Sequence, residues 1–132
     1  MMAAQRSTMD AAGDSALPSG ALQPGAGKRP FIRVTEIWVP TKDRKQLELA
    51  SGLYGPLAEF RQVSEGTRFG YDEGLPGKAW AAGHPIVLKN LTNSYFLRGD
   101  AAHAAGLTCA VALPIFSGEF LIAVMVLFCG DD

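Results

Sequence analysis

The chain has 132 residues, 12 of them Lys or Arg and 13 Asp or Glu, which gives a formal net charge of -1. This length suits a single domain, and the balanced charge provides no basic stripe, so neither nucleic acid nor a membrane is expected as a partner. The two cysteines are too few for a disulfide framework, so we expect a reducing, cytoplasmic location.

Residues 1–30 consist mainly of Ala, Gly, Ser, Pro and Gln and have no sustained hydrophobic period. This composition is typical of a flexible, low-complexity tail. It includes no apolar stretch of signal-peptide length, so secretion is not expected. We therefore predict one folded domain over residues 31–132, which we expect to be incomplete at its C-terminal end.

A β-hairpin is predicted at the start of this domain. Phe31–Val39 is rich in β-branched and aromatic residues, and a polar turn at Pro40–Arg44 leads to a second strand, Gln46–Gly52. Bulky side chains occupy both faces of the first strand. This pattern is typical of a central strand with other elements packed on each face.

Residues 53–74 have no firm period and are interpreted as a loop with a short extended piece near Phe60–Val63. Leu75–Ala82 is predicted to be a helix of about two turns, because Pro76 favours a helix start and the following glycine favours a C-terminal cap. Ile86–Leu91 is predicted to be another strand.

A second short helix is predicted over Ala101–Ala105, capped by Asp100 and ended by Gly106. Leu107–Phe116 alternates bulky and small side chains, so its bulky face is expected to fill a core while the small face allows a close approach. Phe120–Cys129 completes a second hairpin.

Residues 107–129 form an apolar run long enough to raise the alternative of a transmembrane helix. Pro114 and the turn residues Ser117–Glu119 interrupt this run, so two buried antiparallel strands explain it better. The predicted elements together indicate an α+β architecture built on an antiparallel sheet.

The order of these motifs resembles that of a GAF domain. The resemblance rests on four features in sequence: Gly74–Trp80 (Gly-Leu-Pro-Gly-Lys-Ala-Trp), Gly83–Val87 (Gly-His-Pro-Ile-Val), an Arg-containing helix that ends at Gly106, and the apolar strand Ala110–Ile115. It implies a GAF-like, PAS-related sheet of about five to six antiparallel strands flanked by short helices. It also implies a sensory or regulatory module in signal transduction that binds a small molecule.

The chain departs from the family pattern at both ends. No convincing long amphipathic helix precedes the first predicted strand, and no closing helix follows the last one. Both departures predict sheet surface left uncovered, and large apolar patches are rare on soluble monomers. We therefore expect a homo-oligomer, or docking to an attached or associated effector domain.

No catalytic or metal-binding residues are predicted. Cys109 and Cys129 lie in apolar strand-like runs, so they are expected to be buried and structural, with a thiol-dependent redox enzyme of GAF fold as the less favoured alternative. His84 and His103 lack the spacing of a helical metal pair. No Ser-His-Asp context, phosphate loop, cyclic-nucleotide signature or bilin-attachment motif is found, so any cofactor is unknown and the ligand's identity stays open.

A ligand pocket is expected where the connections gather on one side of the sheet, because the family holds its ligands there. Arg98 with Thr108 would suit a carboxylate or carbonyl, and the alternative is a pairing of Arg98 with Asp72 or Asp100. The residues predicted to bind the ligand are Tyr71, Trp80, Phe96, Arg98, His103 and Thr108. Further candidates for the lining are Trp38, Phe69, Asp72 and Phe116.

The sequence thus favours a non-catalytic, small-molecule-binding sensory domain whose output lies on another domain or protein. An interaction or oligomerisation domain, with a pocket filled by its own side chains, is the alternative from a different functional class.

Overall fold

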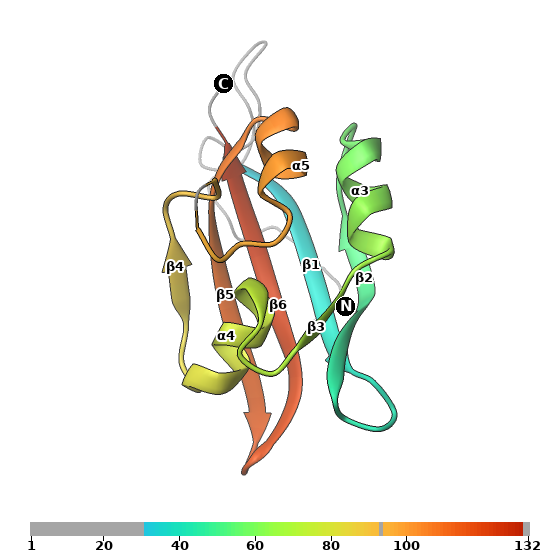
Figure 1. Cartoon of the computed structure of the whole chain (residues 1–132), viewed down its shortest axis with the longest axis vertical. Helices are drawn as coiled ribbons and strands as arrows, with labels where there is room; N and C mark the ends of the chain where they lie inside the picture. The colour runs from blue at the N-terminus through green and yellow to red at the C-terminus, as the bar shows by residue number, and fades with distance from the viewer. Residues whose placement is uncertain (1–30, 93, 131–132) are drawn as a thin grey trace, which may run out of the picture. The chain divides into compact units, whose positions relative to one another are not determined.

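The computed structural model describes residues 31–92 and 94–130, so the predicted tail at residues 1–30 lies outside the described residues. Figure 1 shows the elements in chain order. They are β1 (Ile32–Pro40), β2 (Gln46–Leu53), α3 (Ala58–Glu65), β3 (Arg68–Gly70), α4 (Gly74–Ala82), β4 (Ile86–Leu88), α5 (Gly99–Ala104), β5 (Leu107–Ser117) and β6 (Phe120–Gly130).

The strands form one sheet with the order β3-β2-β1-β6-β5-β4, and every neighbouring pair is antiparallel. The two predicted hairpins are confirmed as β1–β2 and β5–β6. They meet where β1 pairs with β6, which places both strands in the middle of the sheet. The predicted α+β class with five to six strands is therefore confirmed.

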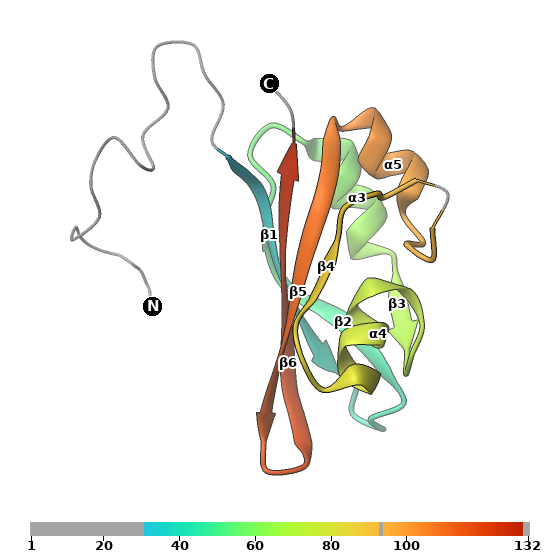
Figure 2. The same cartoon turned by 90° about the vertical axis from the view of Figure 1, so that its left-hand side faces the viewer.

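All three described helices pack on one face of the sheet (Figure 2). On this face Trp38, Val126 and Phe128 are completely buried. No described helix covers the opposite face, so the prediction that elements pack on both faces of β1 is not met by residues 31–92 and 94–130. Within these ranges no helix is long and apolar enough to cross a membrane.

The opposite face, called here the far face, carries rows of side chains that are in register across the strands. One row runs from Val87 through Val111 and Leu127 to Thr35 and Leu53. Its two ends, Val87 and Leu53, are 59% and 75% exposed. The predicted uncovered sheet surface is therefore present among the described residues.

The alternation along β5 is confirmed, but the assignment of its faces is wrong. The small residues Ala110 and Ala112 are completely buried under α4 and α5, whereas the bulky Val111 and Leu113 are half-buried on the far face. Small side chains are needed under the helices because they let a helix approach the sheet closely. Alternation alone does not show which face is packed.

The loop predicted over residues 53–74 is also wrong in part, because it contains α3 and the short strand β3. The inward face of α3 consists of Phe60 and Ser64, which are separated by one helical turn and buried. Serine is a polar residue, so the apolar residues of this segment show no helical period, although Phe60 and Ser64 share the buried face.

The remaining short elements agree with the sequence more closely. The helix predicted at Leu75–Ala82 is confirmed as α4, and Gly83 caps it with a left-handed φ of 75°. β4 ends at Leu88, three residues earlier than predicted. The second helix is also confirmed, although Asp100 lies in the first turn of α5 and Arg98 occupies the N-cap position.

Candidate functional site

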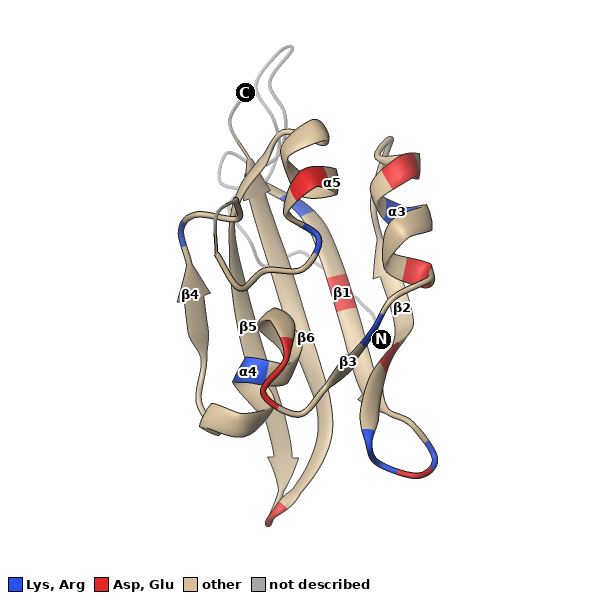
Figure 3. Cartoon of the chain, in the orientation of Figure 1, with Lys and Arg blue, Asp and Glu red and all other residues tan. Residues whose placement is uncertain are grey.

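Two opposite charges are buried between the sheet and the helices. Glu36 lies on the helix-covered face of β1 and is 0% exposed, and Arg98 precedes α5 and is 3% exposed. Arg98 Nη1 donates to Glu36 Oε2 over 2.7 Å and to Ser64 Oγ over 2.6 Å. In Figure 3 the acidic band in the middle of β1 marks the carboxylate side of this pair.

The Glu36 carboxylate is fully engaged. Trp38 Nε1 donates to Oε1 over 2.9 Å, and Tyr54 Oη donates to Oε2 over 2.6 Å. With Arg98, three donors therefore bind this one carboxylate, and hydrogen bonds of this charge-assisted kind are stronger than neutral ones. Burial, followed by the negative charge of Glu36, raises the pKa of Tyr54 well above its usual value, so this hydroxyl remains a donor.

Five aromatic rings surround the Arg98 guanidinium, with centroids 5.0–5.4 Å from its central carbon. These rings form the aromatic cage, which consists of Trp38, Phe60, Phe69, Phe96 and Phe128. All five are at most 5% exposed. Cation–π attraction and the pairing with Glu36 therefore stabilise a charge that would be costly to bury alone.

The pairing with Glu36 does not use all the hydrogen-bonding capacity of Arg98. Its Nε and Nη2 atoms are buried and find no acceptor among the described residues. A buried N–H without an acceptor costs about 1–3 kcal/mol, and ring faces compensate for only part of this cost. The guanidinium therefore offers donors for an additional acceptor.

The chain segment that carries Arg98 is held close to the rest of the domain by its neighbours. Phe96 is buried in the cage, and its ring centroid lies 5.8 Å from that of Phe128. At Gly99 a Cβ atom would lie 2.7 Å from the carbonyl oxygen of Leu91. Only glycine permits this close approach, which lets the start of α5 pack against the segment that follows β4.

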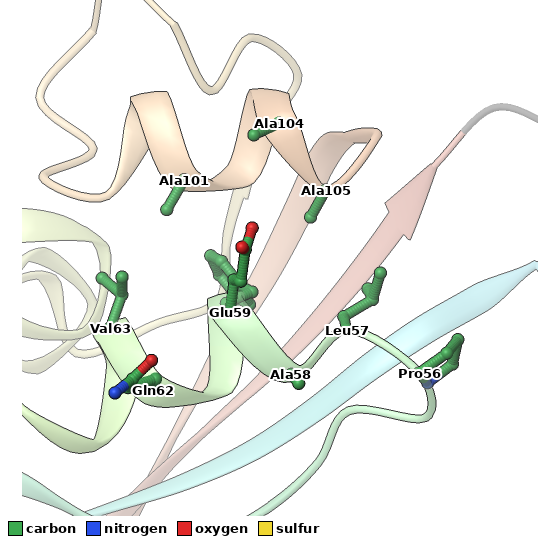
Figure 4. Close-up of a pocket in the computed structure, with 10 residues that line it drawn as sticks. Pro56, Leu57, Ala58, Glu59, Gln62, Val63, Ala101, Ala104 and Ala105 are labelled. Atoms are coloured by element: carbon green, nitrogen blue, oxygen red, sulfur yellow. The ribbon is translucent and has the colours of Figure 1, made fainter.

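A cleft of about 550 Å³ opens between α3 and α5, within the size range of small-molecule sites (Figure 4). Its side chains are mostly apolar, and Glu59 and Gln62 supply the polar groups. Phe60 borders both this α3–α5 cleft and the guanidinium. The lining residues are Pro56, Leu57, Ala58, Glu59, Phe60, Gln62, Val63, Ala101, Ala104 and Ala105.

The structure brings together only some of the residues predicted for the pocket. Phe96 and Arg98 meet in the cage with the two further candidates Trp38 and Phe69. The alternative pairing of Arg98 with Asp72 or Asp100 is wrong, because its carboxylate partner is Glu36. The exposed residues His103, Thr108 and Phe116 are not among the contacts of the guanidinium.

Tyr71 and Trp80 form a separate aromatic pair with ring centroids 5.3 Å apart. Tyr71 is 62% exposed. Beside it, Lys78 Nζ pairs with Asp72 at 3.2 Å on the surface. No contact observed among the described residues joins Tyr71 or Trp80 to Arg98. The role of these two residues in ligand binding stays a prediction.

Sequence reasoning missed five residues of the site. One of them had a readable signal: Glu36 stands two positions from both Val34 and Trp38, so it shares the buried face of β1. A charged residue at such a position indicates a buried pair or a binding group. The five missed residues are Glu36, Tyr54, Phe60, Ser64 and Phe128.

Comparison with known proteins identifies the fold. No protein-family model and no curated protein matches the sequence. The GAF domain of A. aeolicus nlh2 in an inactive state superposes with a TM-score of 0.58 at 23% identity, covering 76% of this chain and 59% of that one. The chain has a GAF-like fold.

Other structures with this fold differ in function. Free methionine-R-sulfoxide reductase from Neisseria meningitidis, in complex with its substrate, gives a TM-score of 0.57 at 18% identity, with 74% of this chain and 52% of that one covered. NreA of Staphylococcus aureus, mutated in its nitrate binding site, gives 0.59 at 12% identity, with 76% and 74% covered. The chain thus spans little more than half the length of the first two structures.

Proposed function

We propose that this GAF-like domain is a regulatory module that binds a small molecule without transforming it. The observation that carries the proposal is the pair of buried Arg98 nitrogens that lack an acceptor among the described residues. Two structures of similar fold offer a parallel, since one was solved with its substrate and the other has a nitrate binding site. The signal would pass to an attached or separate effector, in the cytoplasm.

The charge balance of the site favours a particular class of ligand. Glu36 already neutralises Arg98, so an anion added beside them would leave one uncompensated negative charge in a buried site. A neutral acceptor, such as a ketone, ester or amide carbonyl, satisfies the free N–H groups without adding charge. We therefore expect a carbonyl oxygen at Arg98 and an apolar portion in the α3–α5 cleft.

Phe60 is the residue expected to move on binding. Its ring borders both the cleft and the guanidinium, so a rotation away from Arg98 would connect the two. Phe60 is one of the two buried residues of α3 and packs on Phe128, so such a rotation would remove a main contact between α3 and the sheet. Displacement of α3 is therefore the conformational change that we expect an effector to detect.

Native mass spectrometry of the freshly purified chain tests ligand binding. The expected result is a discrete added mass that disappears on denaturation. Arg98→Lys should lose this mass, because lysine keeps the positive charge beside Glu36 but cannot reproduce the guanidinium fork. Arg68→Lys is the matched control, since Arg68 pairs with Glu48 on the surface.

The apo protein should also gain thermal stability from added neutral carbonyl compounds, and a ligand at 100 times its Kd contributes about 2.7 kcal/mol. Stabilisation by nitrate or acetate instead would contradict the preference for a neutral ligand. Retention of the same mass by Arg98→Lys would exclude the proposed anchor. A wild-type chain with neither a bound mass nor stabilisation by any compound would contradict the proposed function.

An interaction domain with a self-filled pocket is the second candidate. The near-complete burial of Arg98 within five rings favours it, as does the apolar far face. In this case Arg98 itself occupies the space of a ligand. The partner would be a second copy or an effector domain.

This candidate predicts a ligand-free oligomer that depends on the far face. Leu53→Glu combined with Val87→Glu should convert the oligomer to monomers, because both side chains are exposed at the ends of one row on this face. Sedimentation velocity measures the change. Ala82→Glu, at an exposed position of α4, should leave the oligomer intact. A monomeric wild-type chain would contradict the candidate.

A further inference from the structure

The two cysteines of the chain lie directly opposite each other on neighbouring strands. Cys109 of β5 and Cys129 of β6 are Cα partners in the antiparallel register. Directly opposed residues in such a ladder have Cα atoms about 4.5 or 5.5 Å apart, depending on the kind of pair. Both separations fall within the roughly 4.4–6.8 Å range that a disulfide spans. Both cysteines are free thiols in this structure.

Their side chains lie on the far face of the sheet. The adjacent pair, Ala110 and Phe128, is completely buried on the helix-covered face, and successive side chains of a strand alternate between faces. No described helix packs over the two thiols. Cys109 is half-buried, whereas Cys129 is 7% exposed, so a small reagent reaches Cys109 first.

The thiol of Cys109 also affects the titration of Cys129. Burial, followed by the charge and the hydrogen bond of Cys109, raises the pKa of Cys129 to about 11. Cys129 is therefore protonated at neutral pH and is a poor first nucleophile. The greater exposure of Cys109, together with the raised pKa of Cys129, assigns the first step of any oxidation to Cys109, with Cys129 as the resolving thiol.

We propose that Cys109 and Cys129 form a two-thiol site that a peroxide oxidises to a cross-strand disulfide. The inference rests on strand register and exposure and is independent of ligand binding. The expectation from the sequence that both cysteines are buried is confirmed for Cys129 and wrong for Cys109, which is half-buried. The notable feature is that they are opposed and unequally accessible.

The chemistry balances with hydrogen peroxide as the oxidant. The Cys109 thiolate attacks one peroxide oxygen, the O–O bond breaks, and the departing hydroxide takes up a proton to leave as water, which gives a sulfenic acid. The sulfur of Cys129 then attacks this sulfenic sulfur. The S–S bond forms, the S–O bond breaks, and the thiol proton leaves in a second water molecule. The two thiols thus supply the two electrons that reduce the peroxide.

Peroxide treatment followed by intact mass measurement under non-reducing conditions tests the site. The expected product is a monomer lighter by two hydrogen atoms, with no uptake of iodoacetamide after denaturation. Peptide mapping should join the peptides that contain Cys109 and Cys129. A dithiol reductant should restore the original mass and both alkylation sites.

Single substitutions separate the roles of the two thiols. Cys129→Ser should stop at the sulfenic acid of Cys109, which dimedone traps, whereas Cys109→Ser should react at least tenfold more slowly with peroxide. Three results would overturn the proposal: both thiols still open to alkylation after treatment, a disulfide only between chains, or equal reaction rates in the two variants. Each variant should show the wild-type circular dichroism spectrum, so misfolding does not explain a negative result.

Discussion

Glu36→Gln is expected to lower the free energy of unfolding by about 3–5 kcal/mol, the usual cost of removing one partner from a buried ion pair. The substitution is isosteric, so it leaves no cavity. Trp38 donates to one carboxylate oxygen, and Arg98 and Tyr54 donate to the other. A glutamine has one carbonyl oxygen, so at least one of these donors would face an NH2 group while the Arg98 charge loses its partner.

Urea unfolding followed by tryptophan fluorescence measures this effect. Glu48→Gln is the matched control, because Glu48 pairs with Arg68 at 3.3 Å with both side chains largely exposed. Such surface pairs contribute about 0–1 kcal/mol. Equal midpoints for the two variants would contradict the account of Glu36 as the centre of the buried network.

A double-mutant cycle tests whether the loss comes from the pair itself. Arg98→Met alone should also cost about 3–5 kcal/mol, because it leaves the Glu36 carboxylate buried without its cation. The combined variant removes both charges and should lose less than the sum of the two single losses, by about 0.5–3 kcal/mol. Strict additivity would indicate that the two residues stabilise the fold independently.

The sequence predicted correctly the elements that are determined by residues close together in the chain. The β1–β2 hairpin has β-branched strands around a polar turn, and α4 has Gly83 at its end. The β5–β6 hairpin follows from two apolar runs around Ser117–Glu119. In each case the residues that decide the element are adjacent in the chain.

The central features of the site required information that a single sequence does not contain. Arg98 pairs with Glu36 across 62 positions. The alternation along β1 marks Glu36 as an inward-facing acid, but no local pattern shows which cation it meets. The helix α3 was missed because one of its two buried residues is the polar Ser64, whose hydroxyl accepts from Arg98. Its buried position therefore has a chemical reason that becomes visible only in three dimensions.

The same limit applies to the two faces of β5 and to the cysteines. Alternation identified two faces, but the packed one is set by how closely α4 and α5 approach the sheet. The opposition of Cys109 and Cys129 depends on the register of two long strands, which includes an irregularity between Leu107 and Cys109. A shift of one residue would separate the thiols onto different faces.

Gly77→Ala is expected to destabilise the domain by about 3 kcal/mol or more, because the new methyl group would collide with backbone. A Cβ atom at Gly77 would lie 2.2 Å from the carbonyl oxygen of Gly70 and 3.3 Å from the amide nitrogen of Asp72. Rotamer changes cannot relieve a clash with backbone, so α4 would have to move away from the end of β3. Overpacking against a fixed neighbour typically costs about 1–3 kcal/mol and occasionally more.

Movement of α4 would also disturb the hydrogen bonds that connect it to the preceding turn. The Asp72 amide donates to the Gly77 carbonyl over 2.9 Å, and the Gly77 amide donates to the Glu73 carbonyl over 3.1 Å. Gly66→Ala is the matched control, since its φ is −93° and the nearest atoms lie 3.8 Å from the added Cβ. Urea midpoints should therefore separate the two variants clearly. Similar midpoints would mean that α4 can shift on the sheet at little cost, and the second glycine of the Gly-Leu-Pro-Gly motif would then have no steric role.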